Sequence, residues 1–244
     1  MKGAPNLASV TWRYPEPLIP GRLVRRYKRF LAEVELADGQ RVTAHCPNSG
    51  SMLGCLADHA PVFLSHHPEP QRRTAYTWEM IQIGGAWVGI NTGLPNKLVA
   101  EAARQRALPP FADARSVRPE VPLTPGTRLD LLVERERGPL WVEVKNVTLV
   151  EGDLARFPDA VTERGAKHLR EMRALTARGQ AAAMVYLVQR QDAERFTPAR
   201  DIDPAYAREL EQALAAGVEA WVVQARVSPT GVSLWRTIPL WLGG

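Results

Sequence analysis

Cysteine is almost absent, since the 244-residue sequence contains only Cys46 and Cys55. Two cysteines are too few for a disulfide framework, which excludes the small disulfide-stabilised secreted domains and is typical of a reducing cytoplasm. Long apolar runs are also absent, because no stretch approaches the roughly 20 residues that span a bilayer. The first residues, Met1 to Asn6, lack the apolar segment of a signal peptide. We therefore expect a cytoplasmic protein with no membrane partner.

Lysine is scarce as well. The sequence has 31 basic residues, and only five of them are lysines. These are Lys2, Lys28, Lys97, Lys145 and Lys167. The formal net charge of +5 permits a polyanionic partner without requiring one. A composition of 45% hydrophobic and 23% charged residues excludes disorder as the main state.

The first part of the chain contains short strand-like runs separated by turns, with no long helix. Asp38-Gly39 between two such runs is a strong hairpin signal. The expected strands are Leu23 to Leu36, Gln40 to Cys46, Pro61 to His66, Thr74 to Ile83 and Ala86 to Asn91. Five short strands of this kind favour a small barrel. We therefore predict an OB-like β-barrel domain over residues 1–85.

Residues 86–244 alternate between helical and strand-like patterns, which predicts an α/β domain with a mixed central sheet flanked by helices. The expected helices are Asn96 to Ala107, Asp159 to Arg178 and Pro204 to Ala216. The expected strands are Ser116 to Val121, Arg128 to Glu134, Leu140 to Leu149, Ala181 to Val188 and Val218 to Arg226. The fold class is thus α+β, a barrel followed by a mixed α/β domain.

Two predicted strands carry a cluster of charged residues. Because side chains on a strand alternate between its faces, Glu143 and Lys145 project from the same side. If the strands pair through the turn at 137–139, Asp130 lies beside Glu143. Carboxylates in such a cluster suit Mg²⁺ or Mn²⁺, which lower the pKa of a bound water. A nearby lysine can hold that water or stabilise the transition state.

A surface ion pair between Glu143 and Lys145, worth about 0–1 kcal/mol, is the alternative interpretation. Two details favour the metal site. Asp130 lies in the apolar stretch Leu129 to Val133, where an unpaired carboxylate is costly. Lys145 is a rare lysine in an arginine-rich chain, and its compact ammonium suits a hydrolytic site.

A helical acid, Glu101, followed by Asp130 and the Glu143-x-Lys145 pair resembles the core of the PD-(D/E)xK nuclease superfamily, which has the restriction-endonuclease-like fold. Four longer motifs accompany this pattern. They are His45-Cys46-Pro47-Asn48-Ser49-Gly50-Ser51-Met52, Asn91-Thr92-x-x-Pro95-Asn96, Glu143-Val144-Lys145-Asn146-Val147-Thr148-Leu149 and the segment from Phe157 to Leu169. In this order they closely resemble the bacterial and archaeal sugar fermentation stimulation protein A family, from about Leu18 to about Trp221.

This resemblance implies an N-terminal OB-like domain, a C-terminal endonuclease-like domain, DNA binding and regulation of sugar-utilisation genes. Carried over by position, the catalytic residues are Asp130, Glu143, Lys145 and Glu101, and the metal ligands are Asp130, Glu143 and Glu101. The chain departs from the family pattern at Ser49, where threonine is expected, and at Thr127, where serine is expected. Both residues keep a hydroxyl group, so the predicted site stands.

Two segments of the predicted barrel are candidates for contact with nucleic acid. A basic run is interleaved with Tyr27 and Phe30, a pattern that suits phosphate contact and base stacking. The run consists of Arg22, Arg25, Arg26, Lys28 and Arg29. Asn48, Ser49 and Ser51 form the second segment. A solvated strand explains the basic run equally well, and satisfied loop groups are the commoner use of the second segment.

The start of the long predicted helix is a third candidate. Thr162, Arg164 and Lys167 lie where backbone N–H groups and the helix dipole favour anions. A solvated helix turn is an equally good interpretation. His168, on the inner face of the same helix, is within reach of the site, but packing is the preferred role for a lone helical histidine.

Three function classes follow. The first is a Mg²⁺- or Mn²⁺-dependent nuclease that acts on duplex or single-stranded DNA. The second is a non-catalytic DNA-binding regulator on the same scaffold. The third, a protein for small nucleotides or sugar phosphates, ranks last because no glycine-rich phosphate loop is found. Since endonuclease-like domains that cut duplexes often pair, a homodimer is a reasonable expectation.

Overall fold

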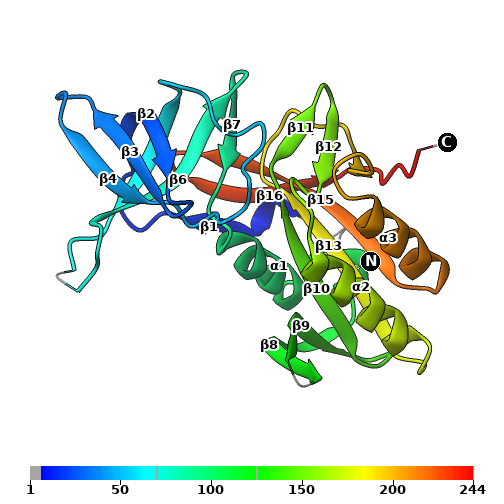
Figure 1. Ribbon diagram of the computed structural model, residues 1–244. Helices are drawn as coiled ribbons and strands as arrows, with labels where there is room; N and C mark the ends of the chain where they lie inside the picture. The colour runs from blue at the N-terminus through cyan, green and yellow to red at the C-terminus, as the bar shows by residue number, and fades with distance from the viewer. Residues whose placement is uncertain (1–6, 70, 125, 244) are drawn as a thin grey trace.

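The computed structural model describes residues 7–69, 71–124 and 126–243. It contains a β-barrel and a larger mixed sheet flanked by helices, which lie side by side (Figure 1). No helix in the described part of the chain is long and apolar enough to cross a membrane.

The barrel consists of β2 (Ile19–Tyr27), β3 (Leu31–Leu36), β4 (Arg41–His45), β5 (Pro61–His66) and β6 (Tyr76–Ile83). They follow the order β4-β3-β2-β5-β6, and an additional β4–β6 pairing closes the barrel. The hairpin strand β7 (Ala86–Gly89) adds to β6. The barrel encloses its own apolar core, which includes Val34, Leu64 and Trp78. The predicted OB-like barrel is confirmed, and the predicted division at residue 85 falls inside the β6–β7 hairpin.

One predicted barrel strand is wrong. The run from Leu23 to Leu36 is two strands, because the chain turns at Lys28 and Arg29, which have φ angles of 50° and 62°. No glycine, asparagine or proline marks this turn, so the usual signal for a reversal is missing. The Asp38-Gly39 turn is confirmed, with Gly39 at a φ of 82°.

The mixed sheet has seven strands in the order β1-β16-β15-β13-β10-β9-β8. The strands are β1 (Thr11–Arg13), β8 (Ala114–Thr124), β9 (Thr127–Arg135), β10 (Leu140–Val147), β13 (Ala181–Val188), β15 (Glu219–Ser228) and β16 (Gly231–Thr237). The central strands β10, β13 and β15 are parallel, and the outer pairings are antiparallel. The predicted mixed sheet is confirmed. The structure adds β1 to it, so residues 11–13 pair outside the barrel.

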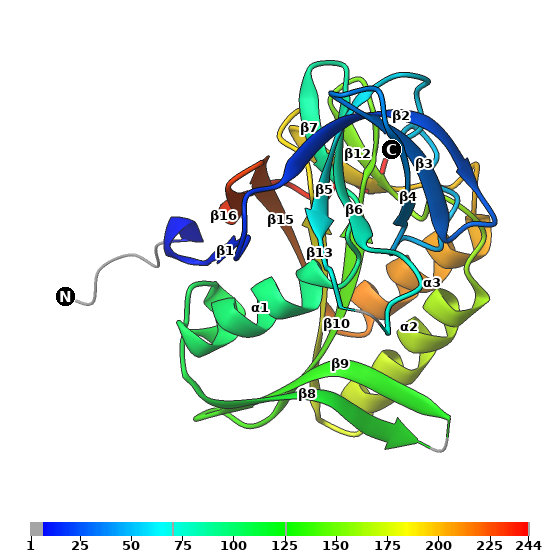
Figure 2. The ribbon, with the colours of Figure 1, turned by 90° about the vertical axis from the view of Figure 1, so that its left-hand side faces the viewer.

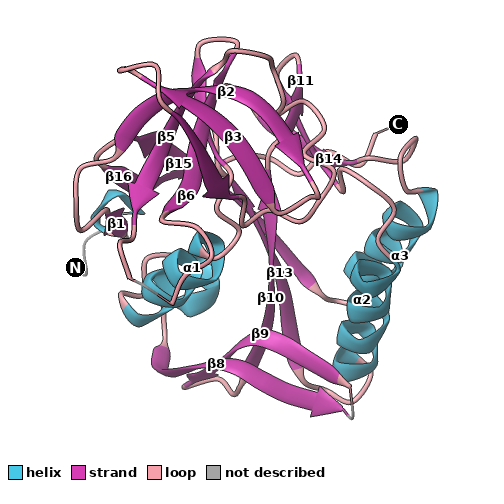
Figure 3. Ribbon diagram, turned by 60° about the vertical axis from the view of Figure 1, so that its left-hand side comes forward, coloured by secondary structure: helices cyan, strands magenta, loops and turns pink. Residues whose placement is uncertain are grey.

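Helices cover both faces of this sheet (Figures 2 and 3). α1 (Leu94–Arg104) packs on one face with Leu131, Val142 and Val144. α2 (Glu163–Thr176) and α3 (Pro204–Ala215) cover the other. The prediction started α2 at Asp159, but the helix begins after Thr162, whose side chain caps it.

β16 had no counterpart in the sequence prediction, and neither did the short elements. They are β11 (Leu149–Glu151), β12 (Leu154–Phe157), β14 (Arg195–Pro198) and the 3-10 helices η1 (Leu7–Ser9) and η2 (Pro109–Phe111). β11, β12 and β14 form a small three-stranded sheet. β12 brings Phe157 and the following Pro158 and Asp159 toward the barrel.

Candidate metal centre between barrel and sheet

A cavity of about 420 Å³ lies where the barrel meets the end of β10. Its floor includes Asp130 of β9 and Glu143 and Lys145 of β10. The structure therefore brings together the three residues that were predicted from strands alone.

Asp130 occupies the point where β9 and β10 separate. Their pairing runs from Leu140 to Val142 on β10, and beyond it the Val144 N–H donates to Asp130 Oδ2 at 2.7 Å. Asn96 Nδ2 of α1 donates to Asp130 Oδ1 at 2.8 Å. Burial and the charge of Glu143 raise the pKa of Asp130 to about 6, although these donors and Lys145 oppose the rise.

Glu143 is buried, with 3% of its surface exposed. Its Oε1 accepts from Lys145 Nζ at 2.6 Å and from His168 Nδ1 at 2.5 Å. Burial raises the pKa of Glu143, but the hydrogen bond from His168 and the charge of Lys145 outweigh it, so the pKa lies below its ordinary value. The predicted common side of Glu143 and Lys145 is confirmed by their contact.

The second oxygen of the Glu143 carboxylate, Oε2, lacks the hydrogen bonds that Oε1 accepts. Glu143 Oε2 is buried and has no hydrogen-bond partner among the residues that the structure describes. A buried carboxylate oxygen without a donor is costly unless a cation or water meets it. Glu143 Oε2 therefore still has the capacity to accept a hydrogen bond from water or to bind a cation.

These residues fit a hard divalent cation. Mg²⁺ is typically held by one or two carboxylates, with water and substrate phosphate completing its shell. Asp130 and Glu143 supply two carboxylates. Across the described ranges, no group of three or more His, Cys, Asp and Glu side chains is placed to hold a metal ion. The site would thus leave most of the coordination shell to water and phosphate.

His168 reaches this centre from α2. It is buried at 3% exposure, as a packing residue would be, yet its ring is hydrogen-bonded to Glu143. Arg164 Nε donates to His168 Nε2 at 3.5 Å, which fits the tautomer that carries its proton on Nδ1. The imidazole therefore positions the Glu143 carboxylate, a role between the two that the sequence suggested.

Glu101 is not brought into the cavity. Its carboxylate accepts from Arg104 and Gln105 on the outer side of α1, and its side chain is 42% exposed. Asn96, in the first turns of the same helix, contacts Asp130 instead. Glu101 lies five residues further along α1, about 140° around the helix axis, and lines a second pocket that it shares with Asn96 and Asp130.

Two arginines of the basic run, Arg22 and Arg26, hold the backbone of neighbouring loops. The Arg26 guanidinium donates to the carbonyl oxygens of Asn48 and Gly50, both at 2.9 Å, and of Ser51 at 3.3 Å. Arg22 donates to the His59 carbonyl oxygen at 3.1 Å. Both Arg26 and this loop were predicted to contact nucleic acid. In the structure, the Arg26 side chain binds the backbone of the loop.

The other members of the run lie further out. Arg25 pairs with Glu33 at 2.7 Å. Lys28 and Arg29 form the exposed β2–β3 turn, next to Phe30, which is 52% exposed. Lys28 and Phe30 line a separate groove on the barrel, so this end of the run remains the part available to a ligand.

The loop at 48–51 forms one wall of the cavity through Asn48, Ser49 and Gly50. Asn48 Oδ1 accepts from the Gly50 N–H at 2.8 Å and thus shapes the loop itself. Ser51 Oγ donates to the Asp159 carbonyl oxygen at 2.7 Å. The side chains of Asn48 and Ser51 therefore stabilise the loop through hydrogen bonds. Asn48 and Ser49 line the cavity.

At the start of α2, side chains of the protein itself accept hydrogen bonds from the backbone N–H groups. Thr162 Oγ1 accepts from the Gly165 N–H, and Asp203 Oδ2 accepts from the Thr162 N–H at 2.8 Å. A carboxylate of the chain therefore takes the N–H of the residue that caps this helix start. Arg164 lines the cavity, while Lys167 lies 3.8 Å from Glu171 and outside the lining.

Sequence reasoning missed Gln189 and did not assign Asn146 a role. Gln189 is fully buried, and its Nε2 donates to Asn146 Oδ1 at 2.8 Å, next to Lys145. Its carbonyl oxygen accepts from the Gly89 N–H of the barrel hairpin. The available signal was a glutamine placed directly after the apolar run of β13.

A closed OB barrel joined to a mixed sheet with a carboxylate and lysine cavity defines a two-part α+β protein. Comparison with known proteins identifies the family. Residues 24–90 match the SfsA N-terminal OB domain, and residues 93–231 match the sugar fermentation stimulation protein RE domain. The chain belongs to the sugar fermentation stimulation protein family.

Similar proteins include two named sugar fermentation stimulation protein homolog. The protein from Geobacter metallireducens is 53% identical over 229 residues, covering 93% of this chain and 99% of that protein. The protein from Rhodospirillum centenum is 52% identical, covering 93% and 99%. A solved structure, described as Pyrococcus furiosus SfsA in complex with Ca²⁺, matches with a TM-score of 0.86 and 25% identity over 95% of this chain and 98% of that chain.

Proposed function

We propose that the chain is a metal-dependent nuclease of the PD-(D/E)xK type. Asp130 and Glu143 would hold Mg²⁺ or Mn²⁺. The observation that carries this proposal is the buried Glu143 Oε2, which has no partner in the described structure and belongs to a residue that lines one cavity with Asp130 and Lys145. The proposal makes DNA the partner and the cytoplasm the place of action.

Each residue of the candidate site has a distinct part in this chemistry. A bound metal supplies a water of lowered pKa and neutralises charge on the phosphate. The Lys145 ammonium, 15% exposed, is placed to orient the attacking water and to stabilise the developing negative charge. His168 holds the Glu143 carboxylate through its Nδ1–H. Arg164 lines the cavity and is available to bind the phosphate oxygens.

The solved Pyrococcus furiosus SfsA is a complex with Ca²⁺, which supports a divalent cation in this family. Ca²⁺ and Mg²⁺ share a preference for oxygen ligands, and Ca²⁺ accepts more of them at longer distances. We infer that Ca²⁺ competes for the carboxylates of Asp130 and Glu143 in this chain.

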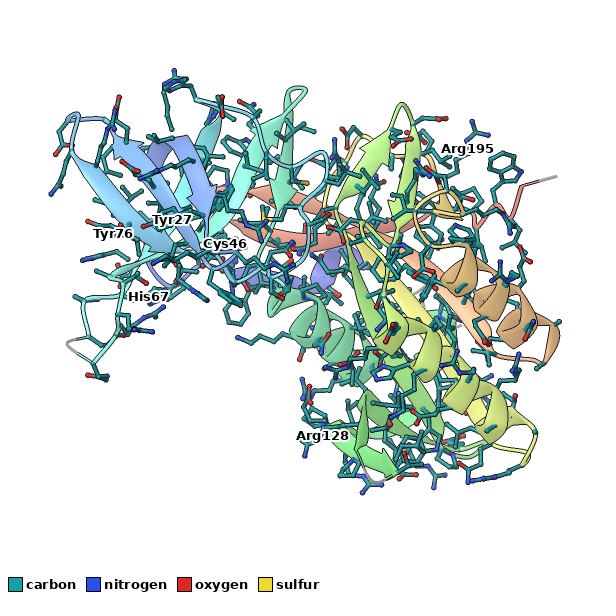
Figure 4. All side chains as sticks on the ribbon, viewed as in Figure 1. Tyr27, Cys46, His67, Tyr76, Arg128 and Arg195 are labelled. Carbon is teal, nitrogen blue, oxygen red and sulfur yellow. The ribbon has the colours of Figure 1, made fainter. Side chains whose placement is uncertain are left out.

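A groove on the barrel supports contact with DNA away from the cavity. It is lined by Lys28, Phe30, Arg73 and Tyr76, among others. Figure 4 shows Tyr76 on the barrel, at the end of the molecule opposite α3. Basic side chains beside exposed aromatic rings can hold a strand by phosphate contact and base stacking.

A non-catalytic DNA-binding regulator is the second candidate. One observation favours it: within the described residues, no third His, Cys, Asp or Glu side chain joins Asp130 and Glu143 in a group placed to hold a metal ion. Such a protein would bind DNA with an affinity that falls as salt rises, with a slope of about −0.9 for each neutralised phosphate. It would leave the DNA intact. The expected homodimer belongs to either candidate, and light scattering would test it.

The deciding experiment is a gel series on plasmid and single-stranded DNA in Mg²⁺, Mn²⁺ or Ca²⁺. We expect wild type to cleave at least one of these two substrates in Mg²⁺ or Mn²⁺. Asp130→Asn and Lys145→Ala should each lower the rate by at least about 100-fold, because they remove a ligand and the ammonium. Lys97→Ala, a lysine outside this cavity, is the control and should cleave normally.

Retarded but intact DNA in every lane would establish the regulator instead. Binding in Ca²⁺ that persists in the two site variants would show that loss of cleavage is a loss of chemistry rather than of affinity.

A further inference from the structure

The candidate metal centre lies at the bottom of a walled cavity. Four segments surround Glu143 and Lys145. They are the barrel loop 48–50, the segment from Thr92 to Asn96 at the start of α1, the segment from Arg156 to Asp159, and Arg164 of α2. A substrate phosphate must therefore enter between the barrel and the sheet rather than meet an open sheet edge.

The barrel wall is fastened to its own strand. Arg26 of β2 donates to the carbonyl oxygens of Asn48, Gly50 and Ser51. Because an arginine fork binds several acceptors at once, it holds the loop in one conformation. The Asn48 side chain adds an internal hydrogen bond to Gly50.

The same wall is also fastened to the other half of the molecule. The Met52 N–H donates to Asp159 Oδ2 at 2.9 Å, and Ser51 Oγ donates to the Asp159 carbonyl oxygen. Thr92 Oγ1 donates to the Pro47 carbonyl oxygen at 2.9 Å. These contacts tie both ends of the loop across the boundary between barrel and sheet.

The cavity is small for a nucleic acid duplex. Its volume of about 420 Å³ lies in the low part of the range, roughly 300–1,000 Å³, of pockets that hold one small molecule. A single nucleotide unit fits such a space, so the second strand of a duplex would have to be held outside it, against the surrounding walls.

We propose that this site takes single-stranded nucleic acid, or the unpaired end of a strand, and excludes continuous duplex. The inference rests on the proposed nuclease function and narrows its substrate. Hydrolysis adds one water across a phosphodiester bond. The water oxygen bonds to phosphorus, the bond from phosphorus to the leaving sugar oxygen breaks, and that oxygen takes up a proton.

The test measures cleavage rates of four labelled substrates in Mg²⁺. These are a single strand, a blunt duplex of the same sequence, the duplex with a single-stranded overhang, and a covalently closed duplex circle. We expect the single strand and the overhang to be cut at least tenfold faster than the blunt duplex, and the closed circle to remain intact. Equal rates on single strand and duplex would overturn the inference while leaving the nuclease in place. No cleavage of any substrate would overturn the proposed function itself.

A pair of variants tests the wall directly. Arg26→Gln releases the three loop carbonyls and should raise the duplex-to-single-strand rate ratio at least threefold. Arg41→Gln removes the same charge from the barrel strand β4, where the side chain pairs with Glu33 and Glu35 rather than with the loop. It should leave the ratio unchanged. Circular dichroism confirms that both variants are folded. An unchanged ratio in a folded Arg26→Gln variant would contradict the part assigned to the wall.

Discussion

Glu143 keeps its negative charge although burial opposes it. Two donors on one oxygen, from Lys145 and His168, favour the charged form, and the other oxygen is without a donor in the described structure. Asp130 has the opposite balance, since burial and the Glu143 charge raise its pKa to about 6. The two carboxylates therefore differ at neutral pH without metal: Glu143 is firmly ionised, and Asp130 is ionised at a cost.

That cost predicts a stabilising substitution. The pKa of Asp130 in the folded protein, about 6, exceeds its ordinary value of 3.8. The folded state thus binds the proton more tightly, so stability falls as pH rises from about 4 to 6 and stays reduced above that. With about 1.4 kcal/mol for each pKa unit, Asp130→Asn should stabilise the metal-free protein by about 1–3 kcal/mol at pH 7.5.

Urea unfolding in EDTA at pH 7.5 and at pH 4 measures this difference, which should vanish at the lower pH. The amide oxygen introduced by Asp130→Asn can still accept from the Val144 N–H, and Asn96 can rotate its amide to donate or accept as needed. Asp58→Asn, at an exposed aspartate, is the control and should have little effect. A destabilised Asp130→Asn variant at pH 7.5 would show that the carboxylate is not strained by its charge.

Local patterns predicted some of these residues and not others. Strand alternation was enough to place Glu143 with Lys145, because the period of two is a property of one strand. The position of Glu101 depends on which face of α1 meets β9, which no local pattern determines. The partners of Arg26 in the loop lie 22 to 25 residues away in the sequence. Its structural role was therefore invisible without the barrel.

Among the elements, α2 connects the site to the rest of the fold. It carries His168 and Arg164, and its first turn is held by the Thr162 cap and by Asp203, the residue that caps α3. Gly165 lies within this turn, where a Cβ would come within 3.1 Å of the Tyr206 ring. The orientation of α2, and with it of His168, therefore depends on close packing of this turn against α3.

Removal of the cap should weaken the helix measurably. Thr162→Ala leaves the Gly165 N–H without its acceptor, which typically costs about 0.5–2 kcal/mol. For a chain of this length we expect the melting temperature to fall by about 2–6 °C. Thr176→Ala, which removes a hydroxyl at the opposite end of α2, controls for the general effect of the substitution. Thermal unfolding by circular dichroism compares the two, and equal melting temperatures would mean that the cap contributes nothing.

Most of the longer elements were predicted, although the seven-residue β16 was missed, and the shortest elements were not predicted, for a physical reason. β13 is a run of eight mostly apolar residues, and α3 begins at a proline after a capping aspartate, so both carry their own signals. β12 and β14 have four residues each. Their strand conformation comes from pairing with each other, which is a property of the assembled molecule rather than of either segment.

At the scale of the whole molecule, the two halves are interleaved along the chain. β1 pairs with β16 at the edge of the seven-stranded sheet, and the chain then builds the barrel before it returns to the sheet. Val10, next to β1, is fully buried in the core of the sheet. The start of the described chain thus belongs to the larger half.

The β1–β16 edge of the seven-stranded sheet depends on a close approach of the two strand backbones. A Cβ at Gly231 would lie 2.4 Å from the Trp12 carbonyl oxygen. We therefore expect Gly231→Ala to displace β1 and to lower the stability by about 1–3 kcal/mol, as overpacking does. Ser233→Ala is the control. Ser233 lies on β16, like Gly231, and pairs with Thr11 of β1.

Urea unfolding measures the stability, and hydrogen exchange should show faster exchange in β1 and β16. Wild-type exchange at β1 in the Gly231→Ala variant would show that the sheet accommodates the methyl group without moving.

The β1–β16 pairing has a consequence for synthesis. β1 is translated before the strands of the barrel, whereas β16 is translated after every other strand of the seven-stranded sheet. Because a growing chain generally folds its N-terminal domains first, the barrel can close while β1 still lacks its partner. The larger sheet can be completed only after nearly all of the described chain has been made. The candidate metal centre takes its lining from residues 48–164, so its walls can assemble only once both the barrel and the chain as far as α2 have been made.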